Sequence, residues 1–115
     1  MSDCVFCMIA AGKIPADVVW QDRHTVAFAD LHPQAPVHVL IVPREHYRGI
    51  DDEVPAEVYA ALCAAAREVA EVVGVAASGY RLIVNTGADA GQTVPHLHVH
   101  LLGGAAMSEG MVTLA

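Results

Sequence analysis

Basic side chains are scarce in this sequence of 115 residues, which has 6 lysines and arginines against 13 aspartates and glutamates and a formal net charge of −7. A surface that follows a nucleic-acid backbone needs clustered cations, so we expect no nucleic-acid partner. The chain also lacks the run of about 20 apolar residues that crosses a bilayer, and it lacks an N-terminal basic patch followed by an apolar segment. We therefore expect a cytoplasmic protein with no membrane partner.

Cysteine is scarce too, with three residues at positions 4, 7 and 63. Three thiols cannot all pair, and without a secretory signal their default state is reduced. Cys4 and Cys7 have the CxxC spacing, for which a metal or redox role is the natural reading. Cys63 lies in an alanine-rich segment, and we expect it to be an inert core residue.

Apolar residues are abundant, at 55% of the chain, and the length suits one core, so we predict a single domain over residues 1–115. A short helix is predicted over residues 4–12, CVFCMIAAG, ending at Gly12 and Pro15. One long helix is predicted over residues 55–74, PAEVYAALCAAAREVAEVVG. Its apolar residues recur at helical spacing, and Gly74 ends it.

Strands are predicted at residues 17–21, 24–29, 37–43, 79–87 and 96–102, with a hairpin turn at residues 22–23. The two prolines of LHPQAP make residues 31–36 a loop, and the glycine-bearing ADAGQTVP joins the last two strands. Five strands against one main helix predict an α+β domain with a largely antiparallel sheet, in which residues 37–43 are central. Pro95 has no amide donor, so the last strand should start at an edge or in a loop.

Three histidines, His96, His98 and His100, alternate with apolar residues in PHLHVHLL. Alternate side chains of a strand share a face, so the three imidazoles should project together while the apolar residues face the helix. This favours a shared site over three unrelated surface histidines. At strand spacing the first and third α-carbons are about 13 to 14 Å apart, which argues against one ion binding all three.

His98 has a histidine on each side and is the candidate nucleophile, because a neutral imidazole both attacks phosphorus and leaves it readily. One ring nitrogen must then keep its lone pair while the other donates to a fixed acceptor, either a backbone carbonyl or His38. Gly91, Gln92 and Thr93 precede the triad and offer amides and a hydroxyl to phosphoryl oxygens. A catalytic metal site built from the three histidines and His38 is the alternative.

A resemblance to the histidine triad (HIT) superfamily is carried by PHLHVHLL and the preceding GADAGQTV. The N-terminal half resembles its Hint branch, the purine nucleoside phosphoramidases, through FCMIAAGKIPADVVWQDRHTVAFADLHPQAPVHVLIVPREHY. The similarity extends over residues 4–104. It implies a HIT-like homodimer whose sheet continues across both subunits, with an AMP or GMP conjugate beside the triad. It also implies attack by His98 on the α-phosphate, with no cofactor required for catalysis.

The resemblance assigns further roles. It implies phosphate contacts for His100 and Thr93, and a role for His38 in orienting His98. Asp30 matches the carboxylate that holds the ribose hydroxyls. The remaining implied nucleotide contacts are an apolar slot for the base, made of Phe6, Ile9, Phe28 and Leu31, and a contact from Asn85.

A structural zinc is also implied, since many bacterial members hold one through a CxxC, a histidine after the third strand and the first triad histidine. The corresponding residues are Cys4, Cys7, His46 and His96. Such a closed Cys2His2 set leaves no open position for catalysis. His96 thus has two candidate roles, in catalysis with the other histidines and in metal binding. A redox pair, or two plain buried thiols, is the alternative for the cysteines.

Other activities stay open at this point. The tail AAMSEGMVTLA lacks the tryptophan typical of eukaryotic Hint proteins, which leaves the leaving group undetermined. The dinucleoside polyphosphate hydrolases of the Fhit type share GQTV and the triad, although KIPA, PQAP and the terminal Gly-Gly favour Hint. A nucleotide-binding regulatory module with residual activity is a further alternative.

Overall fold

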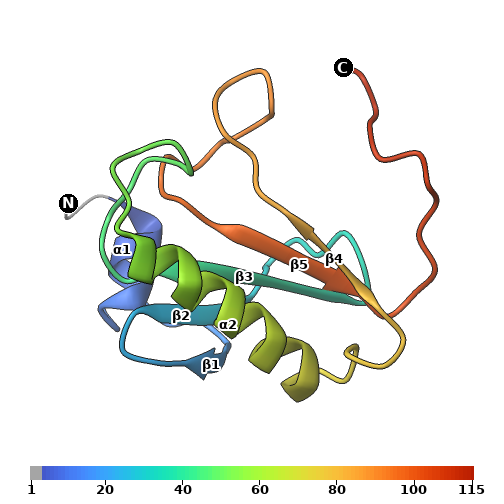
Figure 1. Ribbon diagram of the computed structural model, residues 1–115, viewed down its shortest axis with the longest axis horizontal. Coiled ribbons are helices and arrows are strands. Elements are labelled where there is room, and N and C mark those ends of the chain that lie inside the picture. Colours follow the sequence, from blue (N-terminus) through green and yellow to red (C-terminus); the bar gives the residue numbers. More distant parts are fainter. Residues whose placement is uncertain (1–3) are drawn as a thin grey trace.

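The computed structural model describes residues 4–115, so the predicted domain of residues 1–115 begins with three residues outside the described part. Two helices and five strands follow one another along the chain in an α+β arrangement (Figure 1). In chain order they are α1 (Val5–Ala10), β1 (Val18–Gln21), β2 (Thr25–Ala29), β3 (Val37–Pro43), α2 (Ala56–Val72), β4 (Tyr80–Ile83) and β5 (Val99–Gly103). The predicted fold class is confirmed.

The sheet is antiparallel throughout, with strand order β1-β2-β3-β5-β4, so β3 is central as predicted. The β1–β2 turn is held by Asp22, whose carboxylate accepts hydrogen bonds from the amides of His24 and Thr25 and from the Thr25 hydroxyl, at 2.8 to 2.9 Å. These bonds hold the pKa of Asp22 below its usual value even though burial opposes them. Local side-chain chemistry therefore sets the first hairpin.

Each face of the sheet packs against a different helix (Figure 1). Val39 and Ile41 of β3 join Leu62, Ala65 and other side chains of α2 in the larger apolar cluster. Leu40 and Val42, on the opposite face of the same strand, join Phe6 of α1, with Val26 and Phe28 of β2. The alternation of β3 thus divides the core into two halves. Leu97, Val99 and Leu101 lie in the α2 half, as predicted, which leaves the triad histidines to the α1 half.

The last two strands are shorter than predicted: β4 ends at Ile83 and β5 begins at Val99. Pro95 has no amide donor, and the Leu97 amide donates to the carbonyl of Tyr47, at 2.6 Å, rather than across the ladder. The carbonyl of Pro43 at the end of β3 is occupied by the His96 ring, at 2.9 Å. His96 and His98 therefore precede the strand, and only His100 lies within it.

The prediction that Cys63 is a core residue was wrong, because its side chain is exposed. The buried face of α2 consists of Val58, Leu62, Ala65, Ala66, Val69 and Ala70. At about 100° per residue, Cys63 falls just outside the arc of the helix that these six residues occupy, and its side chain therefore faces solvent.

No helix within residues 4–115 has the length and apolarity needed to cross a membrane.

Candidate active site

The triad histidines divide between two neighbouring groups. The His96 side chain is fully buried and faces Cys4 and Cys7, whereas His98 and His100 line a cavity, with ring centroids 5.0 Å apart. The ring of Phe6 packs edge-on against both His96 and His98, with centroids 5.9 and 5.1 Å away. Phe6 therefore forms the wall between the two groups.

The proton on His98 is placed by a backbone carbonyl. Nδ1 of His98 lies 2.7 Å from the carbonyl oxygen of His96, in buried surroundings. A carbonyl only accepts, so Nδ1 carries the proton and Nε2 keeps its lone pair. Of the two orienting groups considered from the sequence, the carbonyl occupies this place, and His38 contacts His100 instead.

A chain of hydrogen bonds fixes the tautomers of His38 and His100. The Gln34 amide donates to Nδ1 of His38, at 3.0 Å, so the neutral His38 ring has its proton on Nε2. That Nε2 donates to Nδ1 of His100, at 2.9 Å, and it also lies 3.4 Å from a carboxylate oxygen of Asp30. His100 then has its own proton on Nε2. The His100 ring thus brings a donor to the cavity, and the His98 ring brings an acceptor.

Burial keeps His100 neutral. Desolvation, and then the neighbouring His98 and His38, lower its pKa from 6.5 to about 4, although the charge of Asp30 opposes this. At pH 7 the ring is therefore an uncharged donor, poised to hydrogen-bond an anionic oxygen without carrying a charge of its own.

The cavity has a volume of about 410 Å³ and lies between α1, the start of β1, the end of β2 and the segment before β5. Phe6, Ile9 and Phe28 make an apolar wall, and four polar residues also line the cavity: Asp30, Thr93, His98 and His100. Cavities of this size that combine an apolar wall with a few convergent polar groups are typical of small-molecule sites.

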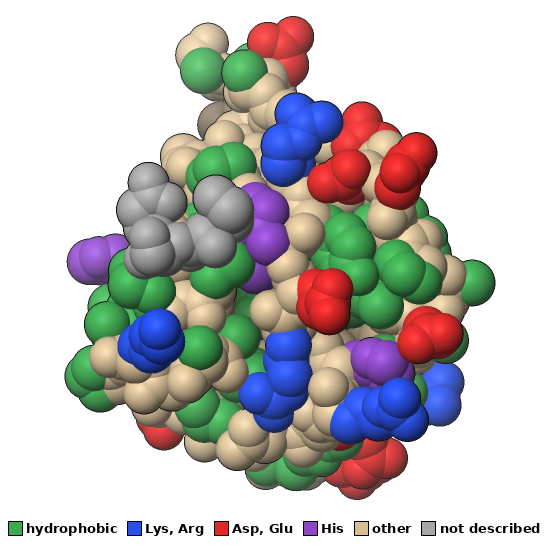
Figure 2. Space-filling view, turned by 90° about the vertical axis from the view of Figure 1, so that its left-hand side faces the viewer, with side chains coloured by type: hydrophobic (Ala, Val, Ile, Leu, Met, Phe, Trp, Pro, Cys, Tyr) green, Lys and Arg blue, Asp and Glu red, His purple; other side chains and the backbone are tan. Residues whose placement is uncertain are grey.

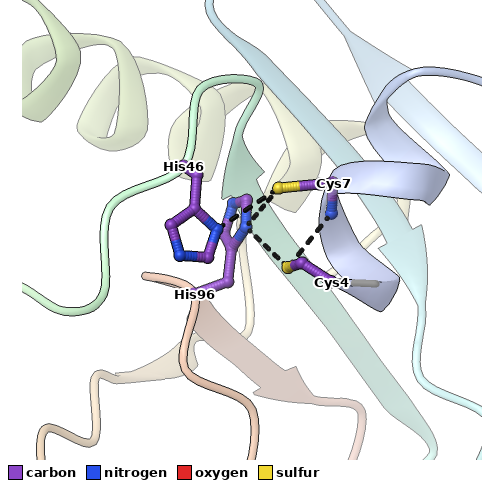
Figure 3. Close-up of side chains that lie close together, drawn as sticks. All are labelled: Cys4, Cys7, His46 and His96. Atoms are coloured by element: carbon purple, nitrogen blue, oxygen red, sulfur yellow. Dashed lines mark hydrogen bonds between the residues drawn. The ribbon is translucent and has the colours of Figure 1, made fainter. Parts of the chain in front are cut away.

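The second group joins four metal-ligand side chains from three separate segments (Figure 3). Sγ of Cys4 and Sγ of Cys7 lie 3.4 and 3.5 Å from Nδ1 of His96, and Sγ of Cys7 lies 3.3 Å from Nδ1 of His46. The four ligand atoms all lie within 4.8 Å of one another. Such a group could bind a metal ion.

The electrostatics of His96 suit ligation. Its Nε2 donates to the carbonyl of Pro43, at 2.9 Å, which leaves Nδ1 without a proton and directed at the cysteines. Desolvation by burial lowers its pKa to about 4, so the ring is neutral, as a ligand must be. Burial, together with the nearby Cys4, raises the pKa of the Cys7 thiol, and a bound cation would offset that effect. A carbonyl partner on the far nitrogen is the usual support for a metal-binding histidine.

Figure 2 views the side of the molecule that lies at the left of Figure 1, where α1 is found. Acidic side chains are most numerous toward the upper right of this face, basic ones lie mainly in its lower half, and histidine is visible in separate places at the surface. This face carries no continuous basic band of the kind that follows a polyanion.

The family model for the HIT domain matches residues 11–107. The chain belongs to the HIT family. It is 45% identical over 105 residues to the purine nucleoside phosphoramidase of Escherichia coli, covering 89% of this chain and 87% of that protein. It is 44% identical over 104 residues to an uncharacterized HIT-like protein of Azospirillum brasilense, covering 87% and 84% of the two chains.

Solved structures agree with the sequence relatives. A HIT family hydrolase from Clostridium thermocellum superposes with a TM-score of 0.92 at 43% identity, covering 97% of this chain and 99% of that one. A HIT family hydrolase from Legionella pneumophila gives 0.89 at 43% identity, covering 94% and 98%. The resemblance seen in the sequence is confirmed, and the chain is a HIT-family hydrolase.

The structure brings most of the implied nucleotide contacts of this HIT protein to one cavity. Its lining includes Phe6, Ile9, Phe28, Asp30, Leu31, Thr93, His98 and His100. Leu31 is 89% exposed and lies at the rim rather than deep in the slot. Asp30 accepts a hydrogen bond from the His32 amide, at 2.8 Å, through one oxygen and turns the other toward His38.

Three implied nucleotide contacts lie outside this cavity lining: Asn85, Gly91 and Gln92. The Gln92 side chain donates to the carbonyls of Arg48 and Val94, at 2.7 and 3.1 Å, and accepts from the Gly87 amide, at 2.9 Å. Gln92 thus holds its own loop closed against the segment after β3. The glutamine of the GQT segment therefore helps to position the loop that carries Thr93, a residue of the cavity lining.

Sequence reasoning missed several cavity residues, among them two of the KIPA segment, the aspartate that follows it, and a histidine near Asp30: Pro15, Ala16, Asp17 and His32. The hairpin places the first three. The Ala29 amide donates to the carbonyl of Asp17, at 2.9 Å, which sets the start of β1 beside the end of β2. The predicted hairpin of β1 and β2 already placed the start of β1 beside Asp30, and Pro15, Ala16 and Asp17 could have been found from it.

Proposed function

We propose that this HIT protein hydrolyses phosphoramidate conjugates of purine nucleotides, AMP-X or GMP-X, through a covalent nucleotidyl-His98 intermediate. The supporting observation is the bond of 2.7 Å from His98 Nδ1 to the His96 carbonyl, which leaves Nε2 with a free lone pair on a ring that lines the cavity. The similarity to a purine nucleoside phosphoramidase supports the choice of reaction.

The cavity suggests how the nucleotide lies. The purine would pack on the apolar wall of Phe6, Ile9 and Phe28, while Asp30 accepts hydrogen bonds from the ribose hydroxyls. The α-phosphate then lies over His98, where Nε2–H of His100 and the hydroxyl of Thr93 can donate to its oxygens. Neutral donors held in place before the reaction stabilise charge that develops on those oxygens.

The reaction divides into two displacements at phosphorus. In the first, Nε2 of His98 bonds to phosphorus, the bond to the amine X breaks, and the amine leaves after taking a proton relayed through Thr93 or a neighbouring histidine. In the second, water attacks phosphorus, the bond to Nε2 breaks, and AMP is released. The proton that the amine consumed is returned by the attacking water.

The test compares wild-type protein, His98→Ala and a control histidine variant, His24→Ala, which lies in the β1–β2 turn away from the cavity. Each is mixed with adenosine phosphoramidate, AMP release is followed, and samples quenched in base are assayed for an acid-labile nucleotidyl adduct. We expect release and adduct in wild type and His24→Ala. His98→Ala should lose both while still binding AMP, and turnover retained in that variant would exclude the covalent route.

A metal-dependent hydrolysis is the second candidate, because Asp30, His38 and His100 also have ligand atoms within 4.8 Å of one another. Against it, Nε2 of His38 and Nδ1 of His100 are directed at each other, at 2.9 Å, and His96 belongs to the cysteine group. AMP release without any adduct, restored to chelated protein by added metal, would favour this route.

For the cysteine group we propose a structural zinc, held by Cys4, Cys7, His46 and His96. Two thiolates and two imidazoles are a common closed tetrahedral set, and zinc bound there would join the N-terminal helix to two later segments. Metal analysis of reduced, tag-free protein should give about one zinc per chain, and less than about 0.2 would contradict the assignment.

We also propose a homodimer whose sheet continues through β4, the free edge strand next to β5. Tyr80, Leu82 and Val84 alternate along this edge and are 36%, 47% and 37% exposed. An exposed apolar edge strand is a template for pairing with another chain. The molar mass in solution, measured by light scattering, should be twice that of the chain; a monomer would contradict the proposal.

A further inference from the structure

One residue belongs to both groups of side chains. The His96 ring faces the sulfurs of Cys4 and Cys7, while the carbonyl of the same residue accepts the Nδ1 proton of His98, at 2.7 Å. His96 therefore links the metal-ligand group directly to the proposed nucleophile. Any movement of the His96 backbone also moves the carbonyl that accepts the His98 proton.

Two hydrogen bonds tie the backbone at this point to distant segments. His96 and His98 precede β5, and their segment is tied to the body by the Leu97 amide on the Tyr47 carbonyl and by the His96 ring on the Pro43 carbonyl. Tyr47 directly follows His46, so the first of these ties also leads back to the metal-ligand group. Outside a regular ladder, backbone position depends on such individual contacts.

A second connection passes through α1. Cys4 caps the start of this helix by accepting from the Cys7 amide, at 3.4 Å, and Phe6 lies between the two cysteines in sequence. The Phe6 ring packs edge-on against the rings of His98 and Phe28, with centroids 5.1 and 5.5 Å away. The two cysteines thus flank a side chain that touches the nucleophile.

We propose that Cys4, Cys7, His46 and His96 form a positioning centre for the nucleophile, in which metal bound to His96 holds the His96 carbonyl and thereby the tautomer and place of His98. The proposal rests on the zinc and phosphoramidase assignments made above. When metal is lost, Nδ1 of His96 keeps only the weak contacts with the Cys4 and Cys7 thiols, the carbonyl is held less firmly, and the His98 ring is freer to exchange its proton between Nδ1 and Nε2. His46, Cys4 and Cys7 would then act on the reaction without touching the substrate.

The decisive variant is His46→Ala, because His46 contacts Cys7 and packs against the His96 ring but is absent from the cavity lining. His46→Cys is the conservative partner, since three cysteines and one histidine also bind zinc tetrahedrally. Cys63→Ser is the matched control, with an exposed cysteine on α2 replaced. Zinc-stripped wild-type protein repeats the comparison without a substitution, in case His46→Ala fails to fold.

Five quantities are measured on each sample: zinc content, kcat and KM with adenosine phosphoramidate, AMP affinity, and the ring ¹⁵N chemical shifts of His98. Circular dichroism checks the fold. We expect His46→Ala and the stripped protein to lose zinc and about 100-fold in kcat, as misplacement by about 1 Å can cause, with a smaller change in AMP affinity. The His98 ring should change from one Nδ1–H tautomer to a mixture.

His46→Cys should recover zinc, kcat and the single tautomer, and Cys63→Ser should match wild type throughout. Folded, zinc-free protein with wild-type kcat and an unchanged His98 tautomer would overturn the positioning role while leaving the phosphoramidase proposal intact. Wild-type protein without bound zinc would overturn it too. Wild-type protein that holds zinc but releases no AMP would instead contradict the proposed function, and the tautomer of His98 would still decide the positioning role.

Discussion

The two faces of the sheet are built in different ways. On the α2 face, Val39, Ile41 and Leu101 pack against the apolar stripe of α2 in the larger cluster. On the α1 face, a six-residue helix covers part of the sheet, and the remainder holds buried histidines, a cavity and the cysteine group.

The α2 face contributes mainly to the stability of the domain, whereas the α1 face holds the groups proposed to take part in the chemistry. Apolar burial is roughly proportional to area and does not depend on direction, so the α2 face stabilises the domain without fixing any proton. On the α1 face each histidine has a directed partner: the carbonyl of His96 for His98, Nε2 of His38 for His100, and the carbonyl of Pro43 for His96. The apolar α2 face thus supports the sheet from which the polar side chains of the α1 face project.

The largest effect should come from the α1 face, with His98→Ala. Because His98 is the proposed covalent nucleophile, its removal should lower kcat by about 10⁴-fold or more. The free energy of unfolding should change less than for a core truncation, because His98 lines the cavity and its removal enlarges an existing space rather than the packed core. Steady-state kinetics and urea unfolding measure the two quantities. If His98→Ala also lowered the free energy of unfolding as much as a core truncation does, stability and chemistry would not be divided between the two faces.

The opposite pattern is expected for Leu62→Ala on α2. Leu62 is 4% exposed and lies in the larger cluster, so its truncation should lower the free energy of unfolding by about 2 to 5 kcal/mol. Under conditions where the variant stays folded, kcat/KM should equal the wild-type value. Urea unfolding followed by circular dichroism gives the first quantity. A folded variant with impaired kinetics would show that α2 also tunes the site.

A smaller effect is expected for Asp30→Asn. If Asp30 accepts from the ribose hydroxyls, loss of its charge should weaken AMP binding by about 1.5 to 3 kcal/mol, the worth of hydrogen bonds to a charged group. Calorimetry with AMP and with 2′,3′-dideoxy-AMP provides the control, because the dideoxy ligand should bind both proteins equally. Equal weakening for both ligands would assign Asp30 to loop structure through its bond to the His32 amide.

The smallest effect concerns pH and His100. Its pKa falls from 6.5 in the unfolded chain to about 4 in the fold, so the unfolded state binds more protons between these values. Stability from this residue is fully present above pH 6.5 and declines as the pH falls toward 4. After allowance for its partial exposure, the loss between pH 7 and pH 5 should be at most about 1 kcal/mol. Urea unfolding of wild type and His100→Gln at both pH values should show a smaller loss in the variant; equal losses would contradict the shifted pKa.

The fold was largely predictable because its signals are local. The helical spacing of Val58, Leu62 and Val69 and the alternation of residues 96–101 each depend on neighbours a few positions away. The errors arose where distant segments compete for the same groups. The hydrogen bond from the Leu97 amide to the Tyr47 carbonyl delayed the start of β5 to Val99. The Gln92 side chain bonds to the carbonyls of Arg48 and Val94, which no local signal announced, and its contact with phosphate stays a prediction.

The sequence by itself determined the α+β class, the central place of residues 37–43 and the separation of the triad histidines from the apolar residues. These features depend on periodicity and turn-forming residues, which are visible within short segments of the sequence. Only the tertiary structure decided which atoms meet. His96 faces Cys4 across 92 positions of sequence, and His38 reaches His100 across 62. The proton on each histidine follows from such contacts, since a ring nitrogen is a donor or an acceptor only relative to the partner that the fold brings to it.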